Sequence, residues 1–330
     1  MTNYHINVTD RCNLKCKHCY AVKKDSEITK ECLDAAISFL KNRIELDKIN
    51  GKESHINILG SEIGLYDCKK INWIMDQFKD MDVTFETSSN LCYNLDDERI
   101  EVYKRFNTFL ASFDYEIRFS NEKERKLWFK NIKTLCSSGV NVSVTFTITN
   151  QLISNVTPQS LIDFMLALPI NTFCFQILST PIQGANDRYN ECLPMCKEMD
   201  NWLFQLYLLY EKYSDVIKIR YFEEAKDRFK GIPCGQFGHN CMQNTITIMT
   251  SGDVATCPTV GKPFYNVLTK ELHEEVFNEL VEKEKKFKPQ CLECEVFDYC
   301  RGSCFLECWD ETGCTGPKKV FMYLKEKLNE

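Results

Sequence analysis

The distribution of cysteine along this chain constrains its chemistry and fold more than any other feature. The chain has 330 residues and 19 cysteines. Three cysteines lie within eight residues near the start, and nine follow residue 233. The first ten residues lack the basic patch and apolar run of a secretion signal. Since a reducing cytoplasm disfavours structural disulfides, cysteines clustered in this way indicate metal ligands.

Composition narrows the class of protein and the partners it can have. Hydrophobic residues make up 44% of the chain and charged residues 27%, which is typical of a globular protein. No apolar run approaches the roughly 18 residues that a membrane helix needs. The net charge is −6 and the basic stretches are interleaved with acids, whereas a nucleic-acid binder usually carries a basic stripe. We therefore expect a cytoplasmic protein with no nucleic-acid and no membrane partner.

From residue 4 to about residue 222, short β-rich runs alternate with longer helical stretches. This alternation predicts parallel strands joined by crossover helices. Six such units fit the α/β class, as a partial (β/α)6, TIM-like barrel whose site lies at the carboxyl ends of the strands. Strands are predicted at 4–9, 55–59, 83–87, 109–113, 140–148 and 172–178, and helices at 29–47, 68–78, 96–105, 123–136, 158–166 and 191–213.

In the remaining third of the chain the regular alternation of strands and helices ends, and cysteines become frequent. A short strand at 217–222 is expected to lead out of the barrel, and strands at 245–249 and 254–257 flank a tight turn. A charged helix at 272–286, a cysteine-rich stretch at 291–314 and an amphipathic helix at 318–328 follow. We therefore predict a barrel domain over residues 1–222 and a small cysteine-rich domain over residues 223–330.

The first three cysteines, Cys12-x-x-x-Cys16-x-x-Cys19, come directly after the first predicted strand. Three thiolates can bind three irons of a [4Fe–4S] cube and leave the fourth iron open, whereas clusters that only carry electrons usually have four protein ligands. The missing ligand implies that another molecule binds the open iron. The alternative is a zinc site with His18 as fourth ligand, but Cys and His only one residue apart point awkwardly for a tetrahedral ion.

The triad resembles the signature of the radical S-adenosylmethionine (SAM) superfamily, which has this spacing with an aromatic residue before the last cysteine. The resemblance implies that SAM chelates the open iron through its amino and carboxylate groups. It also implies that an electron from an external reductant, of the flavodoxin or ferredoxin type, breaks the C5′–S bond of SAM. The resulting 5′-deoxyadenosyl radical would remove a hydrogen atom from an unactivated C–H bond. His18 fills the aromatic place and would pack near the adenine.

Other predicted strand ends extend the resemblance. Gly60-Ser61-Glu62-Ile63 stands where the family has Gly-Gly-Glu-Pro, so the backbone and Glu62 are implied to receive the SAM ammonium group, with Ser61 and Ile63 departing from the pattern. An ordinary polar strand end is an equally good interpretation of each such segment. The further implied SAM contacts are Ser88 and Asn90 after the third strand and Ser112 after the fourth, and the candidate catalytic residues are Asp114 and Tyr115.

The C-terminal cysteines resemble the SPASM extension of radical SAM enzymes, which holds two auxiliary [4Fe–4S] clusters. The matching pattern is a cysteine, ten residues, Gly252, four residues and a cysteine, followed by Cys-x2-Cys-x5-Cys-x3-Cys. Four cysteines on each cluster would leave no open iron, so these clusters would serve electron transfer or structure. A pair of zinc knuckles is the alternative. The resemblance implies Cys234, Cys241, Cys257 and Cys304 for the first cluster, and Cys291, Cys294, Cys300 and Cys314 for the second, with Cys308 competing for the last place.

Enzymes with a SPASM extension mostly modify ribosomal peptides or proteins, by crosslinks, thioethers or side-chain oxidation. The resemblance therefore implies an oxidoreductase or peptide maturase with a peptide or protein substrate. Pro258 argues against a sulfatase-maturing member, because those have aspartate directly after the cysteine that matches Cys257. The substrate is expected to be held by the barrel mouth, by an exposed strand edge or by a separate leader-peptide-binding protein. The alternatives are a radical SAM enzyme acting on a small metabolite and a non-catalytic zinc-binding interaction protein.

Overall fold

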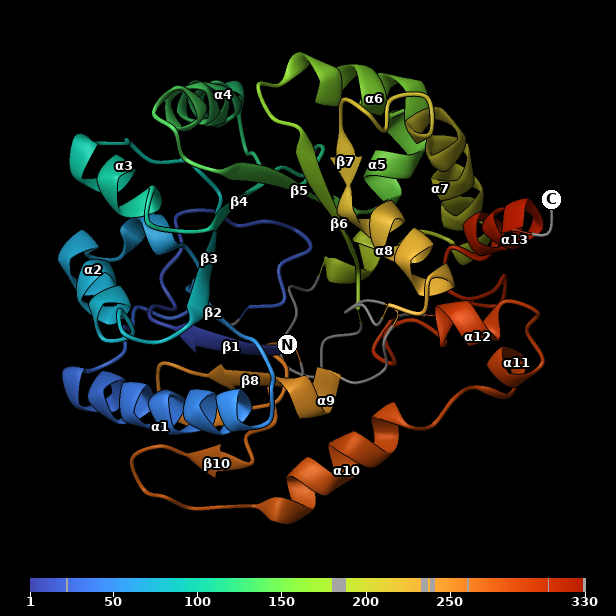
Figure 1. The fold of residues 1–330 in the computed structure, drawn as a ribbon. Coiled ribbons are helices and arrows are strands. Elements are labelled where there is room, and N and C mark those ends of the chain that lie inside the picture. Colours follow the sequence, from blue (N-terminus) through green and yellow to red (C-terminus); the bar gives the residue numbers. More distant parts are fainter. Residues whose placement is uncertain are drawn as a thin grey trace.

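Six parallel strands follow one another through the sheet in chain order, each joined to the next by helices on the outside (Figure 1). The computed structural model describes residues 1–21, 23–179, 188–232, 237, 241–259, 261–307 and 309–328. All six strands predicted for the barrel are present, and their parallel pairing confirms the predicted α/β class. They are β1 (Thr2–Asn7), β2 (Ser54–Leu59), β3 (Val83–Ser89), β4 (Thr108–Ser112), β5 (Val142–Ile148) and β6 (Thr172–Ile177).

The helices around the barrel begin where the sequence supplies a capping side chain. Thr29, Asp67, Asp96, Asn121 and Thr157 each accept a hydrogen bond from a backbone N–H of the first turn that follows, which satisfies a donor that the helix itself leaves unpaired. No helix in the described ranges is long and apolar enough to cross a membrane. The helices so capped are α1 (Lys30–Ile49), α2 (Cys68–Asp76), α3 (Asp97–Tyr103), α4 (Glu122–Ser137) and α6 (Pro158–Ala167).

Between β5 and β6 the short helix α5 (Asn150–Asn155) was not predicted. The helix predicted at 191–213 is divided into a single 3-10 turn, η2 (Tyr189–Cys192), and α7 (Cys196–Tyr210). The division falls at Leu193, which is extended because the ring of Pro194 excludes a helical conformation for the residue before it.

The strand predicted at 217–222 is mostly helical. Only β7 (Lys218–Ile219) pairs with β6, and α8 (Arg220–Phe229) follows at once. Its buried residues Tyr221, Phe222 and Ala225 have helical rather than alternating spacing. Burial of one apolar helix face therefore decides the structure of this segment, although its residues also favour a strand.

The C-terminal segment extends the same sheet. The predicted hairpin is present as β8 (Thr245–Ile248) and β9 (Asp253–Ala255), and Gly252 in its turn has a φ of 87° that favours glycine. A further strand, β10 (Tyr265–Asn266), pairs with β9, and β8 pairs in parallel with β1. The ten-stranded sheet, in the order β10-β9-β8-β1-β2-β3-β4-β5-β6-β7, therefore crosses residue 222, and the predicted division into two domains stays a prediction.

The other elements are short except for two helices. The 3-10 helix η1 (Ile63–Leu65) follows β2, and the C-terminal helices are α9 (Cys241–Asn244), α10 (Glu274–Glu284), α11 (Pro289–Leu292), α12 (Phe297–Cys300) and α13 (Lys318–Leu328). The predicted helix at 318–328 is confirmed residue for residue, and the one predicted at 272–286 is two residues shorter at each end.

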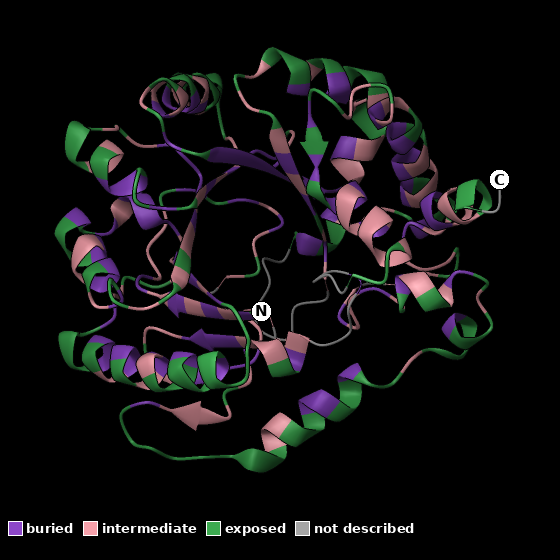
Figure 2. Cartoon of the chain, in the orientation of Figure 1, coloured by how far each residue is buried: buried purple, intermediate pink, exposed green. Residues whose placement is uncertain are grey.

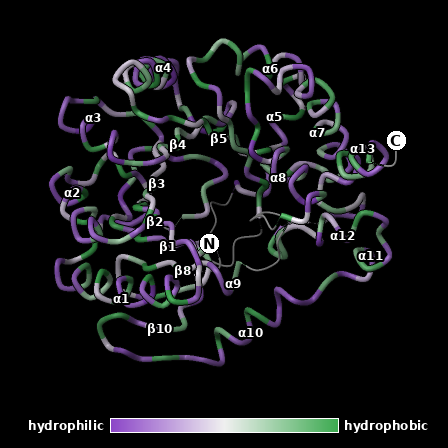
Figure 3. The backbone as a smooth tube through the Cα atoms, viewed as in Figure 1, coloured by the Kyte–Doolittle hydropathy of each residue, from purple (hydrophilic) through white to green (hydrophobic). Residues whose placement is uncertain are grey.

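The apolar core lies between the outer faces of the strands and the helices (Figure 2). Hydrophilic and hydrophobic residues alternate along the surrounding helices (Figure 3), as helices with one buried face require. An aromatic cluster at β4 and β5 is the densest part. The Phe113 ring lies 4.9 Å from Trp128, 4.9 Å from Phe164 and 5.9 Å from Phe146, measured between ring centroids.

Phe146→Ala tests this core, because Phe146 is almost fully buried and contacts several of these rings. The cavity left behind should lower the free energy of unfolding by about 3–5 kcal/mol, measured by urea unfolding followed by circular dichroism. The control Leu272→Ala, at a residue 59% exposed, should change it by less than about 0.5 kcal/mol. Equal stability of the two variants would contradict this account of the core.

Candidate functional site

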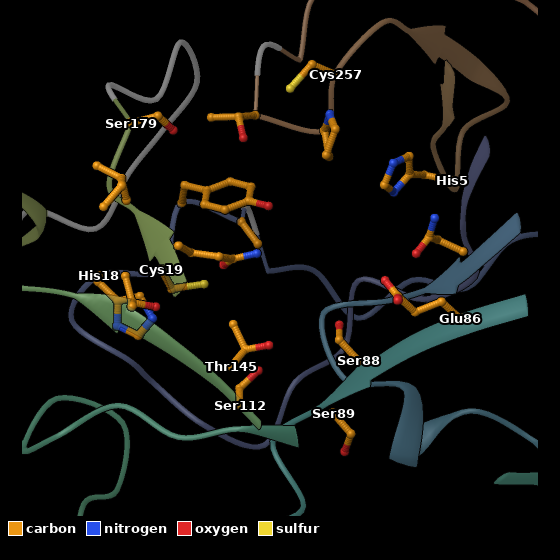
Figure 4. A pocket seen from close by; sticks show the side chains of 18 of the residues that line it. His5, His18, Cys19, Glu86, Ser88, Ser89, Ser112, Thr145, Ser179 and Cys257 are labelled. Carbon is orange, nitrogen blue, oxygen red and sulfur yellow. The ribbon is translucent and has the colours of Figure 1, made fainter. Parts of the chain in front are cut away.

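The interior of the barrel contains a cavity of about 1000 Å³ that collects residues from distant parts of the chain (Figure 4). Strand ends of the barrel and the loop after β1 contribute to its lining, and so does the cysteine-rich C-terminal segment. Among the residues predicted for the site, the lining includes Cys12, Cys16, His18, Cys19, Gly60, Ser61, Glu62, Ser88, Asn90, Ser112, Cys241, Cys257 and Cys304.

The three cysteines of the triad lie in the loop that follows β1. Cys16 is buried, and Cys12 and Cys19 are half-buried, in a small apolar cluster with Leu14 and Cys92. Burial raises the pKa of the Cys12 thiol and raises that of Cys16 to about 11. The Cys12 and Cys16 thiols would therefore keep their protons near neutral pH, and metal binding would have to drive their loss.

Polar side chains hold this loop against its neighbours. Asp10 accepts hydrogen bonds from the hydroxyls of Ser26 (2.6 Å) and Thr250 (2.7 Å), which ties the start of the loop to the β8–β9 turn. Asn90 donates its side-chain amide to Asn13 Oδ1 at 2.8 Å, and the same nitrogen lies 3.9 Å from Cys12 Sγ. Sequence analysis did not identify Asp10 or Asn13, because their partners lie far away in the chain.

A buried ion pair lies behind His18. The Asp114 carboxylate accepts hydrogen bonds from Arg118 Nε and from the Thr147 backbone N–H, both at 2.7 Å, and His18 Nε2 lies 3.4 Å from its Oδ2. Burial by itself would raise the pKa of Asp114, but Arg118, His18 and Thr147 outweigh it, so this pKa lies below its ordinary value. Burial lowers the pKa of His18, and its Nδ1 is buried without a partner among the described residues. The ion pair thus orients an imidazole whose other nitrogen is available to a ligand.

The two candidate catalytic residues lie outside the cavity lining. Asp114 is almost fully buried, and Tyr115 packs against the hydrophobic core. Asp114 reaches the cavity through His18 and Arg118, which both line it. Arg118 was not identified from the sequence, since only the fold brings it beside Cys16 and Asp114. The catalytic assignment of Asp114 and Tyr115 stays a prediction.

Glu62 joins the ends of two strands. Its Oε1 accepts hydrogen bonds from the Gly64 backbone N–H (2.8 Å) and the Ser89 hydroxyl (2.7 Å), and its Oε2 accepts one from the Asn90 N–H (2.7 Å). Burial raises the pKa of this carboxyl group. A carboxylate has about four acceptor positions, so one remains for a donor such as an ammonium group. Glu62 could therefore still accept a hydrogen bond from SAM, as predicted, while its three existing hydrogen bonds hold the ends of β2 and β3 together.

Gly60 is required by close packing within the chain. A Cβ atom at this position would lie 2.7 Å from Thr9 Cγ2 and 3.0 Å from the Thr9 carbonyl oxygen. The Ser61 N–H donates to that same oxygen at 2.8 Å. Gly60 thus packs closely against Thr9, in the loop that follows β1, and it also lines the cavity, so its predicted contact with SAM stays a prediction.

A second cavity, of about 580 Å³, collects the other predicted ligands. Cys291, Cys294, Cys300 and Cys314 all line it. Cys196, the first residue of α7, also lines it and was not predicted as part of any site. Cys234 and Cys308 lie outside the described residues, so the complete ligand set of the first auxiliary site and the choice between Cys308 and Cys314 stay predictions.

The residues of both cavities fit thiolate-bound clusters in their donor chemistry. Soft sulfur donors suit Fe–S clusters, and the first cavity is lined by the triad thiols together with those of Cys241, Cys257 and Cys304, while the second is lined by five other thiols. Within the described ranges, no group of three or more His, Cys, Asp or Glu side chains is arranged to hold a single metal ion. The assignment of these cysteines as cluster ligands therefore stays a prediction.

Comparison with solved structures confirms the fold. The chain is similar to native anSMEcpe with bound AdoMet, with a TM-score of 0.79 and 17% identity over 99% of this chain and 98% of that one. It is similar to anSMEcpe with AdoMet and the Cp18Cys peptide (TM-score 0.75, 17% identity, 99% and 97% covered). It is also similar to Streptococcus suis SuiB (TM-score 0.62, 15% identity, 94% and 77% covered). The fold expected from the resemblance to radical SAM enzymes with a SPASM extension is thereby confirmed.

Sequence-based comparison finds no such likeness. No protein-family model matches the chain, and no curated protein matches it in sequence. The likeness to the solved structures is therefore one of fold, at 15–17% sequence identity.

Asp114→Asn tests the ion pair behind His18. The substitution leaves the Arg118 guanidinium buried without its counter-charge and should lower the free energy of unfolding by about 3–5 kcal/mol, measured by urea unfolding. The double variant Asp114→Asn/Arg118→Met removes the isolated charge as well and should regain part of that loss. A single variant as stable as the wild type would show that the pair does not support the site.

Proposed function

We propose that this chain is a radical SAM enzyme that cleaves SAM reductively and removes a hydrogen atom from a peptide or protein substrate. The carrying observation is the shared cavity, whose lining contains the triad cysteines together with Cys241 and Cys257 of the predicted first auxiliary site. The solved neighbours support the proposal, because anSMEcpe has been solved with bound AdoMet and also with the peptides Cp18Cys and Kp18Cys.

Cys12, Cys16 and Cys19 would hold the SAM-binding [4Fe–4S] cluster. When bound, the cluster and SAM together would supply a carbon-centred radical on reduction by an external one-electron donor of the flavodoxin or ferredoxin type. Cys16 is buried and Cys12 and Cys19 are half-buried, which limits the access of water to the thiolates, and Asn90 and Asn13 hold the loop against β3. The Ser88 and Ser112 side chains line the cavity and offer hydrogen bonds to a polar cofactor.

Eight further cysteines would hold two auxiliary [4Fe–4S] clusters. Cys241, Cys257 and Cys304 line the reaction cavity, which supports a first cluster that faces the substrate, with Cys234 as its fourth ligand. The four ligands of the second cluster line a separate cavity, which supports a role in structure or in electron transfer away from the substrate.

The support for a peptide substrate comes from anSMEcpe, whose structures contain the bound peptides Cp18Cys and Kp18Cys. In this chain the cavity of about 1000 Å³ would hold SAM and clusters as well as part of the substrate, and most of the strand residues facing it are polar. The reaction would be a crosslink, a thioether or a side-chain oxidation, and a separate protein that binds the leader peptide would serve as a partner. Pro258, which follows Cys257, also lines the cavity, so the residue that departs from the sulfatase-maturing pattern lies where the substrate would bind.

The triple variant Cys12→Ala/Cys16→Ala/Cys19→Ala tests the proposal. Wild-type protein reconstituted without oxygen should contain about 12 irons and form 5′-deoxyadenosine from SAM. The triple variant should keep about 8 irons and form none, since only the SAM-binding cluster is lost. Zinc in place of iron, without SAM cleavage, would refute the proposal and favour the interaction module. SAM cleavage that a sugar or amino acid stimulates, and peptides do not, would favour a small-metabolite enzyme.

Cys300→Ala tests the second auxiliary site. Cys300 is buried in the second cavity, so its loss should remove about 4 irons. The electron paramagnetic resonance signal of the triad cluster should still change on addition of SAM, because the two cavities are separate. Cys136→Ala, on the outer helix α4, is the matched control and should keep the wild-type iron content. Full iron content in Cys300→Ala would overturn the assignment of this cluster.

A further inference from the structure

The charged stretch at the end of α10 contains one buried acid. Its neighbours are exposed, as a charged helix predicts: the side chains of Glu282, Lys283 and Lys285 are 63%, 50% and 58% exposed. Glu284 lies among them and is only 4% exposed. A carboxylate is rarely buried unless it is paired or hydrogen-bonded. The position of Glu284 therefore calls for a role that a solvated helix face does not explain.

Glu284 binds the backbone of α9, which lies beside α10 (Figure 1). Its Oε1 accepts hydrogen bonds from the Cys241 N–H at 2.7 Å and from the Met242 N–H at 3.3 Å, and its Oε2 accepts from the Met242 N–H at 3.2 Å. The bonded path from the Cys241 nitrogen to its sulfur passes only through Cα and Cβ of the same residue. The carboxylate therefore fixes the piece of backbone that carries this thiol.

The apolar face of α10 packs behind the same site. The described candidate ligands of the first auxiliary cluster pack against a buried group formed by Met242, Leu280, Val281 and Leu306. Met242 also connects the two sides of the site, because its sulfur accepts a hydrogen bond from the Thr256 hydroxyl at 3.0 Å, and Thr256 directly precedes Cys257. Glu284 thus belongs to the packing that holds the ligand-bearing segments together.

The hydrogen bonds of Glu284 also affect the electrostatics of a bound cluster. The reduction potential of an Fe–S cluster depends on nearby charge and on hydrogen bonds to its sulfur atoms. Glu284 occupies the N–H groups of Cys241 and Met242, so they are not available to sulfur. Backbone N–H donors favour the ionised form of a carboxyl group, and a negative charge opposes the addition of an electron. Both effects lower the potential.

We propose that Glu284 is a positioning residue of the first auxiliary site, which holds Cys241 in place as a ligand and keeps the reduction potential of the bound cluster low. The inference rests on the proposed function for the presence of that cluster. Cys241, Cys257 and Cys304 line the reaction cavity, so the potential at this place decides how readily an electron left on the substrate is taken up and passed on. Glu284 acts on this step without touching the substrate.

Glu284→Gln tests the effect on the potential. The amide oxygen of glutamine can still accept the Cys241 N–H, so the substitution keeps the position of the ligand and removes the charge. The midpoint potential of the first auxiliary cluster should rise by about 59 mV, which is a tenfold change in the ratio of reduced to oxidised cluster for a one-electron couple. The measurement is a redox titration followed by electron paramagnetic resonance. It uses the reconstituted Cys12→Ala/Cys16→Ala/Cys19→Ala chain, in which only the two auxiliary clusters should remain.

Two comparisons assign the shift. The second auxiliary cluster, identified as the signal that Cys300→Ala removes, should keep its potential in Glu284→Gln. Glu282→Gln makes the same change on an exposed side chain of the same helix, where water and salt screen the charge, and should leave both potentials unchanged.

Glu284→Ala tests the positioning of Cys241. It removes the acceptor as well as the charge, so the chain with an intact triad should lose about 4 irons on reconstitution. Glu284→Gln should keep them, because the hydrogen bond to the Cys241 N–H is retained. If Glu284→Ala does not fold, the potential measured in Glu284→Gln still decides the question.

Three results would overturn the inference. They are an unchanged or lower potential in Glu284→Gln, an equal rise in Glu284→Gln and Glu282→Gln, and a wild-type iron content in Glu284→Ala. Clusters that form but do not respond to Glu284 contradict this inference alone and leave the proposed function standing. A chain that binds no first auxiliary cluster with Glu284 in place would contradict both.

Discussion

The parallel pairing of β8 with β1 is the contact on which the rest of the structure depends. It joins Thr245 to Asn3 and Ile248 to Ile6, across more than two hundred residues of chain. Because of it, the hairpin that leads to Cys257 extends the barrel sheet, and Cys241 and Cys257 face the same cavity as the triad. The Thr250–Asp10 hydrogen bond adds a polar link at the same junction. Without this pairing the two groups of cysteines would belong to separate surfaces.

A second constraint is the contrast between the two faces of the strands. Apolar side chains on the outer faces pack against the helices, which contributes most of the burial that stabilises the fold. The inner faces carry polar side chains, so the interior stays open as a cavity. The Asp114–Arg118 pair brings charge into the buried wall, where it holds His18 in place. The apolar packing outside the strands thus stabilises a fold whose interior contains buried charged groups such as Asp114 and Arg118.

Prediction from sequence succeeded where the signal is local. The six barrel strands, most of the surrounding helices and the helix at 318–328 follow from periodicity, caps and turn residues. It erred at Leu193, where Pro194 divides a helix, and after Ile219, where buried Tyr221 and Phe222 favour a helix over a strand. It could not identify Asp10, Asn13 and Arg118, because each acts through contacts that exist only in the folded chain.

The spacing of the triad cysteines indicated the kind of chemistry to expect, since a motif within a few residues has its geometry built in. The resemblance to a known family implied the auxiliary ligand sets, which stay predictions. The order of strands and helices was likewise encoded locally. The meeting of the triad with Cys241 and Cys257, the burial that raises the pKa of Cys16, and the buried Nδ1 atom of His18 arise only in the fold. These properties depend on distances between residues far apart in the chain and on the exclusion of water, and no local pattern encodes either.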